Sequence, residues 1–252
     1  MSFDVGADAY GRFMGRYSEQ LAVQLADYAG VEPGQRALDV GCGAGALTAV
    51  LAERLGSERV AALDPSEPFV DAARLRLPSV DIRLASAESI PFDDDGFDVT
   101  LAELVVQFMS DPVGGVIEMA RVTRPGGTLA ACVWDHGTDR GALSPFWKVA
   151  RKLDPGVDDE SGLTGVRDGQ LVDVFRAAGV RDIRSTALTV SVEYQSFEEW
   201  WQPYLLGVGP AGAYVATLSD EERARLRAAC EESFPSVPFT IVATAWTAAG
   251  TV

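Results

Sequence analysis

The residues with the clearest chemical potential are a carboxylate and three glycines in the segment Arg36-Ala-Leu-Asp-Val-Gly-Cys-Gly-Ala-Gly45. Residues 37–40 have the apolar composition of a short buried strand. The glycines lack the Cβ that would hinder a sharp turn or a ligand lying against the backbone. Residues 46–55 follow with helix-forming composition and apolar residues at helical spacing. A strand, a glycine loop and a helix N-terminus together predict a ligand cradle.

Two classes of ligand use such a cradle. Gly41 and Gly43 fit the loose pattern of dinucleotide-binding loops, in which a pyrophosphate lies on the helix N-terminus. Asp39 would repel a pyrophosphate, but it could accept hydrogen bonds from a cationic, amine-bearing ligand such as S-adenosylmethionine. The loop alone therefore leaves a nicotinamide-dependent oxidoreductase and an S-adenosylmethionine-binding protein as alternatives.

A second carboxylate supports an adenosine-type ligand in either case. Residues 60–64 form a predicted buried strand that ends in Asp64. This acid follows the glycine loop at the spacing where an acidic side chain accepts hydrogen bonds from both ribose hydroxyls. Pro65 and Ser66 then begin a predicted helix that runs to about residue 75.

Composition and spacing predict the remaining elements of an α/β fold. A helix capped by Ser18 is expected over residues 18–28. Further helices are expected over residues 169–178 and 220–230, and further strands over residues 80–85, 97–102, 181–194 and 239–248.

The segment Leu38-Asp-Val-Gly-Cys-Gly-Ala-Gly45 closely resembles the first motif of class I S-adenosylmethionine-dependent methyltransferases. The runs Ser86-Ala-Glu-Ser-Ile-Pro-Phe92 and Arg124-Pro-Gly-Gly127 extend the resemblance over residues 10–134, most strongly toward ubiquinone and menaquinone C-methyltransferases and other small-molecule enzymes. The resemblance implies a Rossmann-like, doubly wound sheet of order 3-2-1-4-5-7-6 with strand 7 antiparallel. It also implies S-adenosyl-L-methionine as cofactor and S-adenosyl-L-homocysteine as product.

The resemblance further implies which residues bind the cofactor. An N-terminal flap would bring Tyr10 near the cofactor and pair Arg16 with its carboxylate, although a surface helix that packs its aromatic side chains explains this segment equally well. Phe69 would lie close to the adenine, and Ser86 stands where the family usually has Asp. The expected cofactor-binding set is Tyr10, Arg16, Asp39, Gly41, Gly43, Asp64, Pro65, Phe69, Ser86, Ala87, Glu88, Glu103 and Leu104.

The expected reaction is methyl transfer to an O, N or C nucleophile of a small, partly apolar or aromatic molecule. Because the sulfonium is already an activated leaving group, the protein has mainly to align the reactants and exclude water. His136 is a candidate general base for a hydroxyl nucleophile, and an ordinary loop histidine is the alternative. A nicotinamide-dependent oxidoreductase and a non-catalytic S-adenosylmethionine-binding protein remain alternative functions.

At 252 residues the chain can bury one full core, so a single methyltransferase domain is expected over residues 1–252. Segments that the sheet does not require predict cap elements at 1–30, 135–168 and 195–237. Aromatic residues in the last two segments, including Trp147 and Trp200, suggest an apolar substrate pocket, and for any single ring packing of the cap against the sheet is the favoured alternative.

A net charge of −16 argues against a nucleic-acid substrate, because phosphate binding needs a basic surface. Three cysteines and one histidine predict a reducing compartment and no metal site. The sequence has no run long enough to span a membrane and no secretion signal, so a cytoplasmic location is expected. The oligomeric state, monomer or homodimer, stays open.

Overall fold

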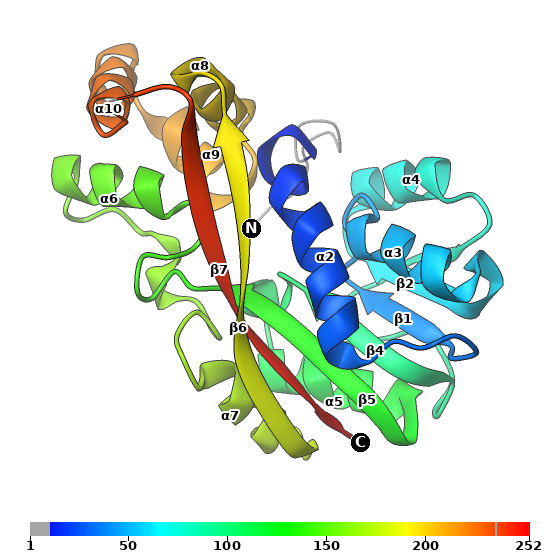
Figure 1. Ribbon diagram of the computed structural model, residues 1–252. Coiled ribbons are helices and arrows are strands. Elements are labelled where there is room, and N and C mark those ends of the chain that lie inside the picture. The colour runs from blue at the N-terminus through cyan, green and yellow to red at the C-terminus, as the bar shows by residue number, and fades with distance from the viewer. Residues whose placement is uncertain (1–10, 235) are drawn as a thin grey trace.

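The centre of the computed structural model, which describes residues 11–234 and 236–252, is a seven-stranded sheet (Figure 1). Its order is β3-β2-β1-β4-β5-β7-β6, and β7 is antiparallel to both of its neighbours. The predicted order and the antiparallel seventh strand are confirmed. The strands are β1 (Ala37–Val40), β2 (Val60–Asp64), β3 (Asp81–Leu84), β4 (Phe97–Glu103), β5 (Thr123–Trp134), β6 (Arg181–Tyr194) and β7 (Phe239–Thr251).

Helices cover both faces of this sheet, so β1 and β2 are buried along their whole length. Alternate residues of these strands enter two separate cores: Ala37 and Ala62 pack on one face, Leu38 and Ala61 on the other. The helices α2 (Arg16–Ala29), α3 (Ala46–Leu55) and α4 (Glu67–Arg76) supply the first core, and α5 (Pro112–Val122) and α7 (Gln170–Ala177) the second.

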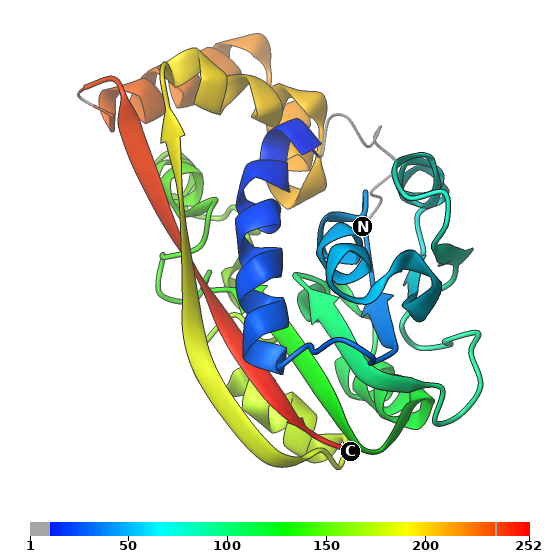
Figure 2. The ribbon, with the colours of Figure 1, turned by 45° about the vertical axis from the view of Figure 1, so that its right-hand side comes forward.

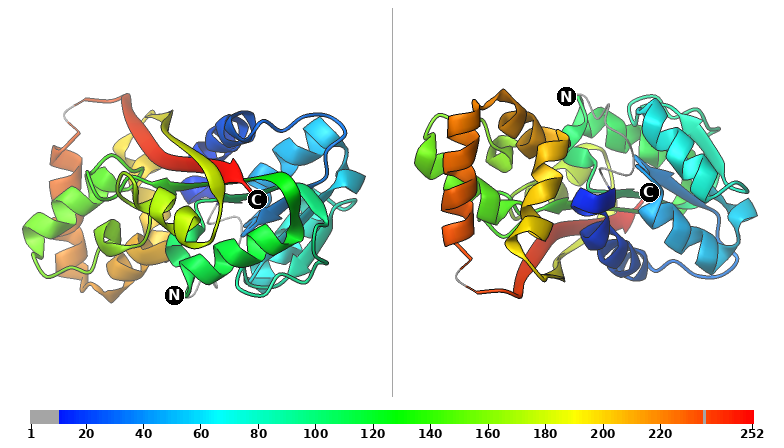
Figure 3. Two further views of the ribbon diagram at one scale, coloured as in Figure 1. Left: turned by 90° about the horizontal axis from the view of Figure 1, so that it is seen from below. Right: turned by 90° about the horizontal axis from the view of Figure 1, so that it is seen from above.

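A group of short helices lies beyond the ends of β6 and β7, which extend past the rest of the sheet toward it (Figures 1 and 2). We call this group the helical layer; it consists of α6 (Ser144–Leu153), α8 (Phe197–Trp201), a 3-10 turn at Gln202–Leu206, α9 (Gly209–Thr217) and α10 (Asp220–Glu232). Seen from above, the layer lies to one side of α2 and the region of α3 and α4 to the other (Figure 3).

Aromatic side chains hold the helical layer together. Phe146 of α6 stacks on Tyr204 with ring centroids 4.5 Å apart, and Phe13 meets Tyr204 edge-on at 5.0 Å. All three rings are buried, and such contacts add to the free energy gained from burying their apolar area. Phe13 belongs to a π-helical turn at Gly11–Gly15 that leads directly into α2.

The start of α2 differs from the prediction. The helix begins at Arg16, and Ser18 is a buried residue inside its first turn instead of the cap. Further 3-10 turns cover Ser57–Arg59, Val106–Phe108 and Glu160–Gly162. Over the part of the chain that the structure describes, no helix is long and apolar enough to cross a membrane.

Candidate active site

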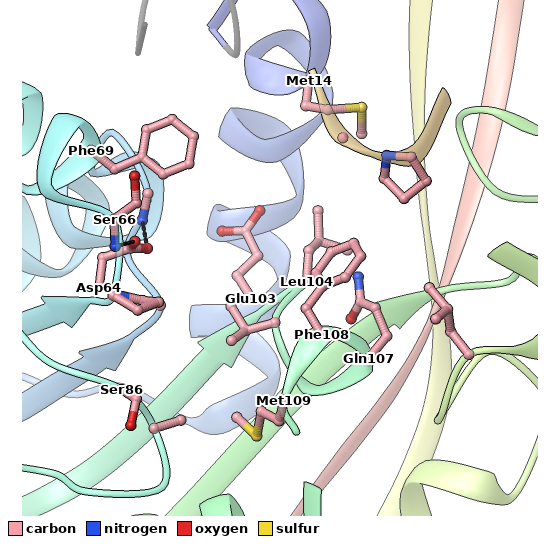
Figure 4. A pocket seen from close by; sticks show the side chains of 18 of the residues that line it. Met14, Asp64, Ser66, Phe69, Ser86, Glu103, Leu104, Gln107, Phe108 and Met109 are labelled. Carbon is pink, nitrogen blue, oxygen red and sulfur yellow. Dashed lines mark hydrogen bonds between the residues drawn. The ribbon is translucent and has the colours of Figure 1, made fainter. Parts of the chain in front are cut away.

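A cavity of about 1260 Å³ opens at the carboxyl ends of β1, β2 and β4, between these strands and the helical layer (Figure 4). Ordinary ligand pockets measure roughly 300–1,000 Å³, so this cavity has room for two ligands side by side. The residues of the predicted cofactor set that line it are Gly41, Gly43, Asp64, Pro65, Phe69, Ser86, Ala87, Glu88, Glu103 and Leu104.

The glycine loop approaches the cavity with its backbone. Gly41 has φ +76°, and a Cβ there would overlap the side chain of Val105, so this position admits only glycine. Gly43 has φ +52°, but a Cβ there would meet nothing within 4 Å. Since Gly43 lines the cavity, the space beside it is available to a ligand that lies directly on the loop.

Asp64 connects this loop to the start of α4. Its Oδ2 accepts a hydrogen bond of 2.9 Å from the amide of Gly43, and its Oδ1 accepts one of 2.9 Å from the amide of Ser66 (Figure 4). Burial raises the pKa of Asp64, while the two amide donors lower it. The carboxylate therefore fixes the loop while facing the cavity. Phe69, on the same helix, adds a ring that is 4% exposed.

Asp39 lies beneath the loop instead of facing the cavity. Its Oδ2 accepts a hydrogen bond of 2.6 Å from Thr48 on α3, and its Oδ1 has no hydrogen-bond partner among the described residues. Burial raises the pKa of Asp39 to about 7, against the hydrogen bond from Thr48, which lowers it. Asp39 is not among the residues that line the cavity, and its contact with the cofactor stays a prediction. Its observed role is to tie β1 to α3.

Glu103 stands at the end of β4 with its side chain directed into the cavity between Asp64 and Leu104 (Figure 4). Its Oε1 is shielded from solvent and finds no partner in the described chain. Burial, and then the charge of Asp39, raises the pKa of Glu103 well above its ordinary value. Such a carboxylate would gain from a cationic group of a ligand.

Leu104, the residue after Glu103, has an unusual backbone conformation. Leu104 has φ +61°, a region that side chains other than glycine rarely adopt, and its amide donates a hydrogen bond of 2.9 Å to the carbonyl of Cys132. Strained residues of this kind persist where the surrounding structure holds them, often at functional sites. The turn directs both Glu103 and Leu104 toward the cavity.

Two of the predicted residues, Arg16 and His136, do not line the cavity, and a third cannot be placed. Tyr10 lies outside the described residues. Arg16 does not line the cavity: its guanidinium donates hydrogen bonds of 2.6 Å to Glu199 Oε1 and to the carbonyl of Glu193. With these partners on β6 and α8, its position does not support a pairing with a cofactor carboxylate. His136 is 4% exposed and also lies behind the cavity wall.

Sequence reasoning missed the residues that close the cavity on the side of the helical layer. Gln107 Oε1 and Trp134 Nε1 are buried, line the cavity and have no partner among the described residues. Glu160 is 4% exposed and lines the cavity as well. No motif marks these positions, and Glu160 ends an acidic run whose composition is typical of a solvated loop. Within residues 11–234 and 236–252, no cluster of three His, Cys, Asp or Glu side chains could hold a metal ion.

Comparison with known proteins agrees with this geometry. Residues 38–131 match the family described as methyltransferase domain. Malonyl-[acyl-carrier protein] O-methyltransferase of Serratia marcescens is 36% identical over 129 residues, 49% of this chain and 50% of that protein. Demethylmenaquinone methyltransferase of Renibacterium salmoninarum is 32% identical over 147 residues, 58% of each chain. The chain spans about half the length of the curated relatives it matches.

A solved structure shares the fold beyond the matched segment. Phosphoethanolamine N-methyltransferase 2 of Haemonchus contortus, determined with S-adenosylhomocysteine, superposes with a TM-score of 0.62 over 98% of this chain and 57% of that one, at 18% identity. Residues 38–131 therefore match the methyltransferase domain family, and the strand order and the glycine loop agree with that match.

Proposed function

We propose that this chain is an S-adenosylmethionine-dependent methyltransferase of a small molecule. The observation that carries the proposal is the open space at Gly43 beside Asp64, inside a segment that matches methyltransferases. A cavity larger than one ordinary ligand needs supports the presence of a second reactant.

The residues of the cavity fit the cofactor. The loop at Gly41 and Gly43 would hold its methionine portion, Asp64 its ribose hydroxyls, and Glu103 its ammonium group. Phe69 would cover the adenine, and the segment 86–88 would reach the edge of that ring. When bound, S-adenosylmethionine supplies a methyl group on a sulfonium that is already activated. The chain itself has then only to bind, orient and shield the reactants.

The substrate would lie toward the helical layer. Phe13, Trp134, Leu143 and Val208 give this side of the cavity an apolar wall. We propose that residues 1–252 form one domain and that segments 1–30, 135–168 and 195–237 form a cap on it. The methyl acceptor, a partly apolar molecule with an O, N or C nucleophile, would bind in the space beneath this cap. His136 could reach a substrate only through Glu160, whose Oε1 is 3.8 Å from its Nε2. A direct role as general base is therefore not part of the proposal.

The charge of the site weighs against other ligands. A pyrophosphate would meet Asp64 and Glu103, and the described residues of the cavity wall include no basic side chain to offset them. This disfavours a nicotinamide cofactor, and with the net charge of −16 it disfavours nucleic acid as substrate. Three buried cysteines without a disulfide are consistent with the cytoplasmic location that we propose.

Two measurements test the proposal. Calorimetric titration should detect binding of S-adenosylhomocysteine and none of reduced nicotinamide dinucleotide. Incubation with tritiated S-adenosylmethionine and a panel of small phenols, amines and quinols should label at least one product. Nicotinamide binding in place of S-adenosylhomocysteine would contradict the proposal. Binding without any turnover would instead favour a protein that binds the cofactor without catalysing methylation.

A further inference from the structure

The cavity wall is acidic at both ends. Among the side chains that the structure describes, which do not include that of Arg12, the ionisable groups of the wall are all carboxylic acids: Asp64, Glu67, Asp71, Glu88, Glu103 and Glu160. Such a wall attracts cations and repels carboxylates and phosphates, and the net charge of −16 acts in the same direction.

Most of these acids lie at the end of the cavity where the cofactor is proposed to bind, and their roles there are accounted for. Asp64 accepts hydrogen bonds from the loop amides, and Glu88 accepts them from the amide and hydroxyl of Ser110. Glu67 and Asp71 are exposed on α4 at the outer rim. Glu103 ends β4 and suits the cofactor ammonium. Glu160 alone among the six comes from the segment between β5 and β6 that the sheet does not require.

Glu160 is a buried carboxylate held by a neutral donor. Its Oε2 accepts a hydrogen bond of 2.8 Å from the indole nitrogen of Trp147, and its Oε1 is 3.8 Å from His136 Nε2, beyond hydrogen-bonding distance. Burying a carboxylate is costly unless a cation or several donors compensate. One indole N–H leaves most of the acceptor capacity of Glu160 unused.

The nearby arginines are engaged elsewhere. Arg151 pairs with Asp139 and Asp159. Arg167 donates to the carbonyls of Gly137 and Ser161. Glu160 has no arginine or lysine partner among the ion pairs of the described residues, although it lines the cavity.

We propose that Glu160 binds a protonated amine of the methyl acceptor, and hence that the acceptor is a small apolar molecule that carries an amine. This inference rests on the proposed methyltransferase function and adds the substrate class. Leu143, Leu163 and Val208 line the same side of the cavity and would pack against the apolar body. Trp147 fixes the carboxylate through its indole N–H and is a positioning residue.

The test compares probes that share an apolar body and differ in one group. The protein is saturated with S-adenosylhomocysteine and titrated with amine, alcohol and carboxylate versions of phenylethyl, naphthylethyl and octyl compounds. In at least one set the amine should bind at least tenfold more tightly than the alcohol, and the carboxylate more weakly than either. The proposal is overturned if no set prefers the amine.

Two variants connect this preference to the residue. Glu160→Gln keeps the shape of the side chain and should lower the preference for amine over alcohol to less than twofold. The matched control Asp158→Asn removes the same charge from an exposed neighbour and should leave the preference unchanged. Trp147→Phe keeps a ring but removes the N–H donor, so the preference should fall severalfold. It provides a second readout if Glu160→Gln folds poorly.

Binding of S-adenosylhomocysteine separates this inference from the function on which it rests. Wild type, Glu160→Gln and Trp147→Phe should bind S-adenosylhomocysteine with affinities within twofold of one another. If the wild type does not bind it, the proposed methyltransferase function fails. If all three bind it and the preference for amines survives in Glu160→Gln, only the assignment of Glu160 fails.

Discussion

The two ends of the cavity are built in different ways. At the strand ends, Gly41, Gly43 and Asp64 lie within 24 residues of one another in the sequence and meet through the backbone of two adjacent strands. On the side of the helical layer, Phe13, Glu160 and Val208 come from distant parts of the chain and meet only in the folded protein. The first end depends on backbone geometry, and the second on the packing of side chains.

The difference suggests that the two ends respond differently to substitution. A loop that holds a ligand by its backbone tolerates no added side chain, so small changes there should abolish binding outright. A wall of separate side chains should lose affinity or selectivity stepwise, because each residue contributes a part. The following changes test this contrast, beginning with the largest expected effect.

Gly43→Val should abolish binding of S-adenosylhomocysteine, a loss of at least about 3 kcal/mol or roughly a hundredfold. The added side chain would enter the space that the loop leaves open, at φ +52°. Gly34→Val is the matched control: it also carries a positive φ, +95°, with no neighbour within 4 Å of an added Cβ, but it does not line the cavity. Titration calorimetry should show normal affinity for the control. Normal affinity in Gly43→Val would mean that the loop does not carry the ligand.

The raised pKa of Asp39, which lies near the glycine loop, predicts that the free energy of unfolding depends on pH. Its pKa is about 7 in the folded protein, against about 3.9 for an unperturbed Asp. Between these values the folded state holds a proton that the unfolded state has lost. The contribution of Asp39 to the free energy of unfolding therefore falls as pH rises from about 4 to 7, by at most about 4 kcal/mol.

The variant Asp39→Asn isolates this contribution, since it is neutral at every pH and can still accept from Thr48. Its free energy of unfolding relative to wild type should increase from pH 4 to pH 7 in urea titrations. A difference that stays constant over this range would show that Asp39 does not change protonation between the folded and unfolded states.

Asp64→Ala should weaken binding of S-adenosylhomocysteine by about 1–3 kcal/mol, the scale of losing charge-assisted hydrogen bonds. Part of this loss would come from freeing the amides of Gly43 and Ser66. Asp64→Asn keeps acceptor capacity and should lose less. Equal affinities of the wild type and Asp64→Ala, measured on folded protein by calorimetry, would remove Asp64 from the site.

Parts of the fold differ in how accurately the sequence predicts them. The bounds of β1, α3 and β2 agree with the predicted ranges 37–40, 46–55 and 60–64, because short apolar runs between glycines fix them locally. The predicted end of the last strand was residue 248, but β7 continues to Thr251 since β5 and β6 pair with it there. Long-range pairing of this kind leaves no local signal.

The same distinction applies to the candidate site: residues in a local motif can be predicted from the sequence, and residues that only the fold brings together cannot. The glycines and Asp64 were recognisable because their spacing is itself a motif. Glu160 was not, because its burial depends on Trp147 and on the packing of the layer above it. The resemblance to the family's N-terminal flap assigned Arg16 to the cofactor, but its partner Glu199 lies 183 residues away and could not be anticipated.

Arg16→Ala should have the smallest effect of the series, and it tests whether α2 takes part in binding at all. The side chains of Arg16 and Glu199 are 42% and 38% exposed, and surface ion pairs of this kind contribute about 0–1 kcal/mol to stability. Affinity for S-adenosylhomocysteine should stay within twofold of wild type, because the guanidinium points to β6 and α8 instead of the cavity. Glu199→Ala should reproduce the small loss of stability, and the double variant should lose little more, since both single changes break the same pair. A tenfold loss of affinity in Arg16→Ala alone, with Glu199→Ala unaffected, would mean that Arg16 leaves Glu199 and turns to the cofactor carboxylate when the ligand binds.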